Sequence, residues 1–453
     1  MNTGPARGMR DFLPDDLRRR QYVMGVIAEV YQQYGFEPLE TPAVENIETL
    51  LGKYGDEGDR LIFRILKRGE GAETGQADLA LRYDLTVPLA RVVAEYRARL
   101  PKFFKRYQMQ PVWRADRPQK GRFREFYQCD VDAIGSTSMV VEAELLGAAG
   151  EVLRRLGFAG YTLRLNHRQV LSGLLDAGGV PVSLHGDALV ALDKLDKIGH
   201  DGVARELTDR GIGADGAARL LDAFAPVGDP AAIEASAWNT QTLARLAALL
   251  DGRAAEGLAQ LASIIQLVSS TPVGAHLRLD PSLARGLSYY TGAIFEISVP
   301  DLAGSLGGGG RYDGLIGMFL GEQVPAAGIS LGLERILVVM GERGMFPEQF
   351  AASPADVMVT IWNADAVPDA LALAAELRAA GLRVEVYPEP DKLGKQFKYA
   401  ASRNIPCVAI VGDEERAQGL VAVKHLPTAS QQAHRRDGVA HILRSLTART
   451  HHG

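Results

Sequence analysis

The sequence of 453 residues contains little cysteine and no long hydrophobic run. Its two cysteines, Cys129 and Cys407, lie far apart and match no metal-ligand spacing. This excludes a disulfide-rich scaffold, argues against a structural zinc site, and predicts free thiols in a reducing cytoplasm. No segment reaches the ~18 consecutive apolar residues that a membrane helix needs. Residues 1–20 carry three aspartates and lack an apolar core, so we do not expect a signal peptide there.

An excess of basic charge is also absent, because 50 lysines and arginines stand against 55 aspartates and glutamates, a net charge of −5. Any contact with nucleic acid must therefore come from a local basic patch. One such patch lies between residues 102 and 124, where Asp116 is the only acid. Its basic residues are Lys102, Lys105, Arg106, Arg114, Arg117, Lys120, Arg122 and Arg124, and aromatic residues interleave them. Guanidinium groups suit phosphate and aromatic faces suit bases, but a solvated basic hairpin has the same composition.

Hydrophobic spacing divides the first part of the chain into segments of different character. Apolar residues recur every three or four positions over 23–34, which predicts a helix that Gly35 ends; residues 36–42 follow as an extended piece. Short apolar runs alternate with charged turns over 81–135, and we expect antiparallel strands there. Residues 166–271 are rich in alanine, leucine, aspartate and arginine and predict a mostly helical insert, after which strands return.

The last hundred residues alternate strongly between strand and helix patterns. The expected order is strand 357–362, helix 369–380, strand 383–387, helix 393–403, strand 407–411, strand 421–425 and helix 438–446. Continuous apolar strands are typical of sheets covered on both faces, so we expect a small, mostly parallel sheet flanked by helices. The predicted boundaries are 1–165 and 272–350 for one domain, 166–271 for the helical insert, and 355–453 for the C-terminal domain.

Three motifs carry the chemistry. The run Arg-Ala-Asp-Arg-Pro-Gln-Lys-Gly-Arg-Phe-Arg-Glu-Phe at 114–126 predicts strand, loop and strand, and it resembles motif 2 of the class II aminoacyl-tRNA synthetases. In that motif the first arginine, here Arg114, binds the α-phosphate of ATP, and the aromatic residue, here Phe126, stacks on adenine. The helix and strand that end at Pro42 resemble motif 1, which builds the dimer interface. The run ending at Arg335, Gly-Ile-Ser-Leu-Gly-Leu-Glu-Arg, resembles motif 3, whose arginine meets the γ-phosphate.

Two further stretches narrow the resemblance to the histidyl-tRNA synthetases. Residues 283–292, Leu-Ala-Arg-Gly-Leu-Ser-Tyr-Tyr-Thr-Gly, are similar to the histidine motif of that family, and 307–315, Gly-Gly-Gly-Gly-Arg-Tyr-Asp-Gly-Leu, to its second signature. Read alone, the Tyr289-Tyr290 pair fits two core residues of a strand, and the glycine run fits a bend that lets backbones approach. Residues 82–86 and 128–132 also match the family, so the resemblance extends over almost the whole chain.

The resemblance implies a fold and an activity. The fold is α+β: a class II antiparallel-sheet catalytic domain with a helical insert, plus a C-terminal α/β anticodon-binding domain. The activity is that of a cytoplasmic, homodimeric ligase that activates L-histidine with ATP and Mg²⁺ and transfers it to the 3′ end of tRNA(His). The attacking carboxylate is already ionised at pH 7, so no general base is needed. The enzyme must instead stabilise charge on the phosphate oxygens and align the attack.

The resemblance also assigns roles to single residues. Arg114 and Arg285 are the catalytic groups, and Arg285 meets the α-phosphate from the side opposite Arg114. The ATP-binding residues are Arg114, Arg122, Phe126, Arg285 and Arg335. The histidine-binding residues are Asp84, Thr86, Gln128, Asp132, Tyr289 and Tyr290, with Gln128 and Asp132 on the α-ammonium group. Metal ligands are not assigned. Ser288 stands where many members of the family have an acid, and Asp116 stands where motif 2 commonly has glutamate. These two departures from the family pattern concern the details of the binding pocket and not the activity.

Two alternatives and one open question accompany this interpretation. A catalytically silent, histidine-binding regulatory paralogue typically lacks the anticodon domain, whereas this chain continues for about 100 residues after Pro354 and also retains Arg114, Arg285 and Arg335. The retained arginines also argue against a tRNA-sensing module without ligase activity. For the helical insert, Lys194, Lys197 and Arg205 could face the acceptor stem of a tRNA, and a solvated helical surface fits them equally well.

Overall fold

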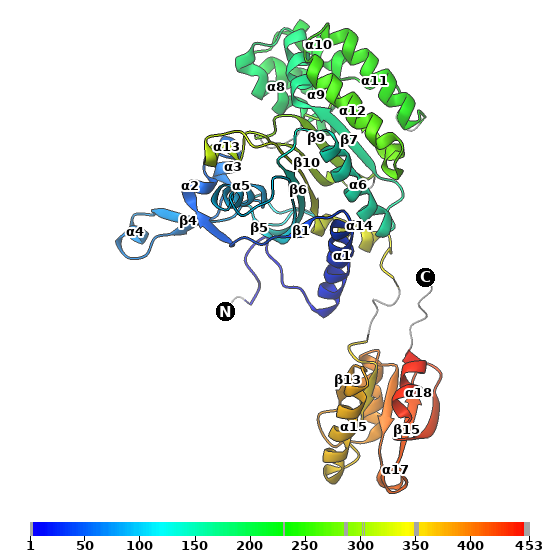
Figure 1. Cartoon of the computed structure of the whole chain (residues 1–453). Helices are drawn as coiled ribbons and strands as arrows, with labels where there is room; N and C mark the ends of the chain where they lie inside the picture. Colours follow the sequence, from blue (N-terminus) through cyan, green and yellow to red (C-terminus); the bar gives the residue numbers. More distant parts are fainter. Residues whose placement is uncertain are drawn as a thin grey trace. The chain divides into compact units, whose positions relative to one another are not determined.

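The computed structural model describes residues 3–229, 232–284, 289–300, 302, 304–347 and 353–447. The chain divides between Met345 and Phe346 into two compact units, and each is described by itself (Figure 1). The N-terminal unit contains a large sheet with helices, and the C-terminal unit contains a smaller one. No helix in the described part of the chain is long and apolar enough to cross a membrane.

The described residues of the N-terminal unit form an eight-stranded sheet in the order β1-β5-β6-β11-β10-β9-β7-β8. The five central pairings are antiparallel, and the outermost pairing at each edge is parallel. The strands are β1 (Glu37–Pro38), β5 (Phe104–Trp113), β6 (Glu125–Ile134), β7 (Thr162–His167), β8 (Leu277–Leu279), β9 (Ala293–Ser298), β10 (Ser305–Arg311) and β11 (Ala326–Gly332). The antiparallel catalytic sheet expected from the sequence is therefore confirmed.

Helices cover one face of this sheet, whereas the other face carries polar residues of β6 and is covered only in part, where α5 (Thr86–Glu95) packs against Ile134. On β6, the apolar residues Cys129, Val131 and Ala133 are buried and alternate with the polar residues Gln128, Asp130 and Asp132. Successive side chains of a strand point to opposite faces. Helices α1 (Pro14–Gln33), α6 (Val140–Arg155) and α14 (Leu333–Glu342) contact β6, and they lie close together in Figure 1. The polar set therefore points away from the helices.

Helix α5 (Thr86–Glu95) corrects the expectation of strands throughout 81–135. The antiparallel hairpin of β5 and β6 is present, with Gln110 opposite Gln128, but a buried helix precedes it. The residue before the N-cap contacts the first turn of this helix, because Oδ1 of Asp84 accepts the backbone N–H of Val87 at 3.0 Å. This bond satisfies a backbone N–H that the first helical turn leaves without a partner. In the sequence alone, an aspartate with this role is hard to distinguish from an aspartate in a charged turn.

The glycine run at 307–310 belongs to strand β10, in the middle of the sheet, and is not a bend. The backbone approach expected there is real, because a Cβ on Gly309 would overlap the carbonyl oxygen of Gly328 on β11. A Cβ on Gly328 would in turn overlap the carboxylate of Asp132. The glycines keep the polar face of the sheet bare beside the polar residues of β6.

The predicted helical insert follows β7 and precedes β8. Its helices are α7 (Arg168–Ala177), α8 (His185–Leu192), α9 (Leu195–Asp209), α10 (Ala214–Phe224), α11 (Ala235–Leu250) and α12 (Ala255–Ser269). Figure 1 shows α8 to α12 gathered at one end of the N-terminal unit. Helix α11 also covers the edge strand β8, because Trp238 Nε1 donates to Leu279 O at 2.8 Å and Asn239 Nδ2 to Leu277 O at 3.1 Å. These bonds satisfy backbone carbonyls that an edge strand would otherwise expose.

A second, small sheet in the order β2-β4-β3 lies near the N-terminus. Its strands are β2 (Val44–Asn46), β3 (Arg64–Leu66) and β4 (Ala77–Leu81), with short helices α2 (Ile47–Leu50), α3 (Gly55–Arg60) and α4 (Glu70–Glu73) between them. A further short helix, α13 (Gly317–Leu320), joins β10 to β11.

The C-terminal unit is an α/β sheet in the order β13-β12-β14-β15-β16. Its elements are β12 (Val357–Val359), α15 (Val367–Ala379), β13 (Val384–Val386), α16 (Leu393–Ser402), β14 (Cys407–Ile410), α17 (Asp413–Gln418), β15 (Leu420–His425), β16 (Ser430–Arg435) and α18 (Val439–Thr447). The expectation of a mostly parallel sheet was wrong, because β15 and β16 are antiparallel to their neighbours. Strand β16 was missed because its residues are polar and almost all exposed, so it has no apolar alternation.

Candidate active site

An open cavity of about 300 Å³ lies on the face of the large sheet that carries the polar residues of β6. Its lining contains nine of the residues singled out by the sequence: Thr86, Arg114, Arg122, Phe126, Gln128, Asp132, Tyr289, Tyr290 and Arg335. They come from the β5–β6 hairpin, the start of α5, the histidine motif and the start of α14. Asp84 does not line the cavity, and Arg285 and Ser288 lie outside the described residues.

Arg114 follows β5 and is held from two sides. Its Nε donates to the carbonyl oxygen of Tyr83 at 3.0 Å. Its guanidinium carbon lies 4.3 Å from the ring centre of Tyr83 and 5.2 Å from that of Phe126, within the range of cation–π contacts. The arginine is therefore oriented before any ligand arrives, and Phe126 lies beside it in the cavity wall.

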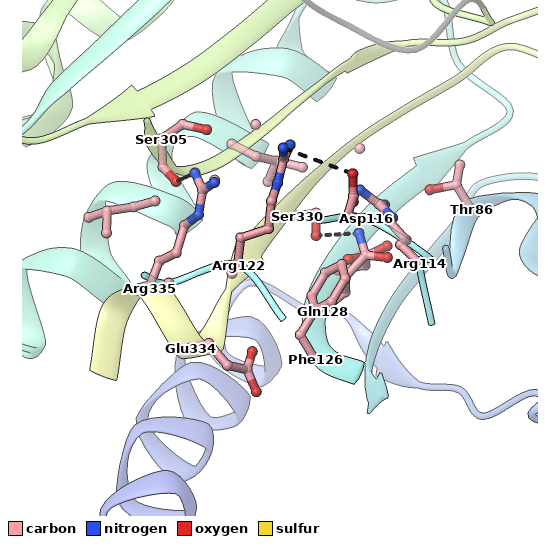
Figure 2. Close-up of a pocket in the computed structure, with 18 of the residues that line it drawn as sticks. Thr86, Arg114, Asp116, Arg122, Phe126, Gln128, Ser305, Ser330, Glu334 and Arg335 are labelled. Atoms are coloured by element: carbon pink, nitrogen blue, oxygen red, sulfur yellow. Dashed lines mark hydrogen bonds and ion pairs between the residues drawn. The ribbon is translucent and has the colours of Figure 1, made fainter. Parts of the chain in front are cut away.

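Two further arginines line the cavity, with Arg122 between Arg335 and Arg114 in the view of Figure 2. Arg122 comes from the hairpin loop, is about half exposed, and has its Nη1 3.9 Å from Oδ1 of Asp116. Arg335 comes from the first turn of α14, and its Nη1 donates to the carbonyl oxygen of Ser305 at 2.5 Å. Three guanidinium groups from two segments, the β5–β6 loop and the start of α14, thus line the cavity, which makes it suitable for phosphate oxygens.

Residues of the N-terminal segment contact the elements that carry these arginines. Glu334 is buried next to Arg335, and its carboxylate accepts from Arg20 Nη1 at 2.9 Å and from the backbone N–H of Tyr127 at 3.0 Å. These bonds join α14, α1 and β6. Arg10 lies over the ring of Phe123, 3.3 Å from its centre, so the hairpin loop is also contacted by residues before α1.

The other end of the cavity carries carboxylates of β6. Asp132 is buried, forms an ion pair with Arg106 at 2.9 Å between Oδ2 and Nη2, and accepts the hydroxyl of Tyr312. Gln128 donates to Oγ of Ser330 at 2.9 Å. Burial raises the pKa of Asp132, and the charge of Arg106 opposes this shift. Negative charge at this end suits a cationic group of a ligand.

Asp130 was missed by the sequence analysis and lines the cavity between Gln128 and Asp132. Burial, together with the neighbouring charge of Asp132, raises the pKa of Asp130 to about 7, against the pull of Arg106. Its Oδ1 has no hydrogen-bond partner among the described residues. The signal was available, because residues 128, 130 and 132 must share one face of a strand.

Asp84 lies behind the cavity wall. It is buried and accepts three hydrogen bonds, from the hydroxyl of Tyr54 at 2.9 Å, the backbone of Val87 at 3.0 Å and the hydroxyl of Tyr289 at 3.3 Å. Burial raises the pKa of Asp84. Tyr289 and Tyr290 meet edge to face with ring centres 5.0 Å apart, and both line the cavity. In this structure Asp84 therefore orients Tyr289.

An antiparallel sheet with the arginines of motif 2 and motif 3 around one cavity defines the catalytic part of a class II aminoacyl-tRNA synthetase. The family model for histidyl-tRNA synthetase matches residues 8–336, and the model for an anticodon binding domain matches residues 356–446. The chain belongs to the histidyl-tRNA synthetase family.

Individual relatives agree with this assignment over nearly the full length. The chain is 45% identical over 445 residues to the histidine–tRNA ligase of Porphyromonas gingivalis, with 94% of this chain and 95% of that protein covered. It is 42% identical over 457 residues to the histidine–tRNA ligase of Gloeobacter violaceus, with 95% of this chain and 96% of that protein covered. The crystal structure of histidyl-tRNA synthetase from Nostoc sp. PCC 7120 is similar with a TM-score of 0.81 and 30% identity, covering 98% of this chain and 99% of that one.

Proposed function

We propose that the protein is a histidine–tRNA ligase that converts L-histidine and ATP to histidyl-adenylate and pyrophosphate and then transfers histidine to the 3′ end of tRNA(His). The observation that carries this function is the polarity of the single cavity. Arginines from two segments, the β5–β6 loop and the start of α14, line one end, and the carboxylates of β6 line the other. A polyphosphate and an amino acid with a cationic ammonium group suit these two ends, with the reacting atoms between them.

For ATP, we assign Arg114, Arg122, Phe126 and Arg335, together with Arg285 from the family resemblance. Arg114 and Arg285 are the catalytic groups, because a fixed guanidinium can stabilise charge on the α-phosphate oxygens with little reorganisation. Among the described residues no cluster of side chains suited to hold a metal ion is present, so Mg²⁺ would arrive on the phosphates of ATP. Asp116 is the available carboxylate at this end, because the oxygens of Glu334 already accept hydrogen bonds from Arg20 and Tyr127.

For histidine, we assign Thr86, Gln128, Asp132, Tyr289 and Tyr290, with Asp84 acting through Tyr289. Asp130 joins this set, because its carboxylate lines the cavity with one oxygen unpartnered while that of Asp132 is already paired with Arg106. A buried carboxylate with an oxygen that no hydrogen bond satisfies favours a cationic ligand. The ammonium group of histidine is such a ligand.

The assembly and the site of action are also part of the proposal. We assign the enzyme to the cytoplasm and propose that it is a homodimer whose interface includes α1 and β1. The proposed catalytic domain consists of residues 1–165 and 272–350. Residues 166–271 form the insert, and residues 355–453 form the anticodon-binding domain. Leu13 and Leu17, at the start of α1, are 70% and 45% exposed, as an interface helix would be in a single chain. Light scattering at micromolar concentration should give about twice 48.8 kDa. An active species of 48.8 kDa would contradict the dimer.

Histidine-dependent exchange of labelled pyrophosphate into ATP tests the activity directly. A ligase exchanges label with histidine and not with the other amino acids. A silent histidine-binding paralogue binds histidine without exchange, and a tRNA-binding module does neither. Absence of exchange in a folded protein that binds both ATP and histidine would contradict the proposed function.

A further inference from the structure

Residues 8–12, which precede α1, lie against the hairpin loop between β5 and β6. The backbone N–H of Arg124, at the end of this loop, donates to the carbonyl oxygen of Gly8 at 2.8 Å. Gly8 has a left-handed backbone, with φ +85°, and a Cβ there would lie 2.8 Å from Cγ of Arg124 and 2.9 Å from Cγ of Pro118. Glycine therefore permits both the turn and the close approach of the two segments.

Arg10 contacts both chain segments that carry the cavity arginines. Its guanidinium carbon lies 3.3 Å from the ring centre of Phe123, well within the range of a cation–π contact. Phe123 lines the cavity and directly follows Arg122. On its other side, Nη2 of Arg10 lies 3.9 Å from Oε1 of Glu334, the residue before Arg335. Arg10 itself is not part of the cavity lining, so it bridges the loop and the start of α14 from outside.

The contact of Arg10 with the ring is the part of this bridge that a substitution should remove. Its side chain is 35% exposed, and a partly exposed ion pair at 3.9 Å contributes little to stability. Glu334 is bonded more firmly to Arg20 of α1, because Nη1 of Arg20 lies 2.9 Å from Oε1 and both side chains are less than 5% exposed. That buried pair remains when Arg10 is removed, so α1 and α14 should stay together.

The loop presents an arginine that a ligand must otherwise order. Two backbone hydrogen bonds between Gln119 and Arg122, at 3.1 and 2.9 Å, close the tip of the loop. The side chain of Arg122 is about half exposed there. Ordering a loop and a long side chain costs binding free energy, and a contact that holds the loop beforehand reduces this cost. Support of the loop from outside should therefore appear as tighter binding of the ligand that Arg122 contacts.

We propose that Arg10 is a positioning residue for ATP, which holds the β5–β6 loop against α14 so that Arg122 and Arg335 are presented together to the phosphates. The inference rests on the proposed ligase function, because that function places a polyphosphate in the cavity. Arg10 acts through Phe123 and touches no ligand. Histidine, assigned to the other end of the cavity, should bind independently of it.

Arg10→Ala tests the proposal in the full-length enzyme. The KM for ATP in histidine-dependent pyrophosphate exchange should rise by about 10-fold, in the range of one partly desolvated cation–π contact. The kcat, the KM for histidine and the midpoint of urea unfolding should stay near wild type, because binding of ATP alone is weakened. Arg10→Lys keeps a cation over the ring and should restore part of the affinity. Arg7→Ala, which removes an exposed positive charge three residues earlier, should change none of these values.

The outcomes of this experiment separate the proposal from its premises. An unchanged KM for ATP in Arg10→Ala would overturn the positioning role. A rise of both KM values together with a lower unfolding midpoint would make Arg10 a structural residue and would overturn it as well. Absence of exchange in the folded wild-type enzyme would instead overturn the ligase function.

A double-mutant cycle with Phe123→Leu locates the contact. If Arg10 acts through the ring, Arg10→Ala should have little further effect on the KM for ATP in the Phe123→Leu background. A full effect of Arg10→Ala in that background would contradict the proposed route. Hydrogen exchange without substrates gives a readout independent of activity, because loop residues 117–124 should exchange faster in Arg10→Ala than in the wild type. Unchanged exchange of these residues would show that Arg10 does not hold the loop.

Discussion

The two ends of the active-site cavity are built differently. The carboxylate end rests on strand β6, where Asp132 is almost completely buried together with its partner Arg106 on the neighbouring strand β5. The arginine end is formed by a hairpin loop and the start of a helix, and Arg122 there is about half exposed. Charges at the carboxylate end are therefore part of the core, whereas those at the arginine end are closer to solvent. Substitutions should accordingly affect folding at the first end and ATP use at the second.

The largest effect is expected for Asp132→Asn, at the carboxylate end. The change leaves Arg106 buried without its counter-charge, and breaking such a pair costs about 3–5 kcal/mol. The midpoint of urea unfolding should fall accordingly. Replacing both residues in Asp132→Asn/Arg106→Met should recover much of this loss, because no buried charge remains. A single variant as stable as the wild type would show that the pair does not stabilise the core.

Arg114→Ala should have the next largest effect, on catalysis and not on folding. One preorganised charge that stabilises a transition state is typically worth about 10²-fold in rate, or ~3 kcal/mol. We expect pyrophosphate exchange to fall by about this factor, while histidine affinity and the unfolding midpoint stay near wild type. The family resemblance predicts the same result for Arg285→Ala. Parallel loss of exchange and stability would instead identify Arg114 as a structural residue held between Tyr83 and Phe126.

Asp130→Asn should change how histidine binding depends on pH. Asp130 has its pKa raised from 3.8 to about 7, so the folded protein retains a proton that the unfolded chain has released. Stability without histidine should therefore fall as pH rises through this window, and a cationic ligand should bind more tightly once Asp130 ionises. We expect histidine affinity to rise by about 10-fold between pH 6 and pH 8, or ~1.4 kcal/mol.

The asparagine variant is the control for this pH effect. The imidazole of free histidine titrates in the same range and contributes equally to both proteins, so the difference between their titration curves belongs to Asp130. Calorimetric titration at several pH values gives the two slopes. Identical slopes would remove Asp130 from the histidine site.

The sequence predicted which residues gather at the cavity better than it predicted the ion pairs and hydrogen bonds that hold them in place. The family motifs singled out nine residues that the structure brings together in the lining of one cavity, because each motif is a local run of sequence. They did not identify the Arg106–Asp132 pair, since ion pairing between strands depends on register and not on spacing. For the same reason Asp84 was assigned to the ligand without its three donors being foreseen. The polar strand β16 was likewise invisible, because only backbone pairing defines it.

The smallest effect, and the most informative about histidine selection, is expected for Tyr289→Phe. Its hydroxyl donates to Oδ2 of Asp84, which keeps two donors when Tyr289 is changed, so stability should fall by only about 1 kcal/mol. If the same hydroxyl also contacts a ring nitrogen of histidine, affinity for histidine should fall by a further ~1–3 kcal/mol. ATP binding should be unchanged.

Tyr54→Phe is the matched control for this experiment, because Tyr54 also donates to Asp84 but does not line the cavity. Both variants remove one donor from Asp84, and only Tyr289→Phe removes a hydroxyl that a ligand can reach. Weaker histidine binding in Tyr289→Phe alone means that the hydroxyl reads the imidazole directly. Equal weakening in both means that Asp84 acts on histidine through the orientation of the pocket. Wild-type affinity in Tyr289→Phe would leave the ring to be recognised by other groups, and Tyr289 would then serve only to pack against Tyr290 and Tyr312.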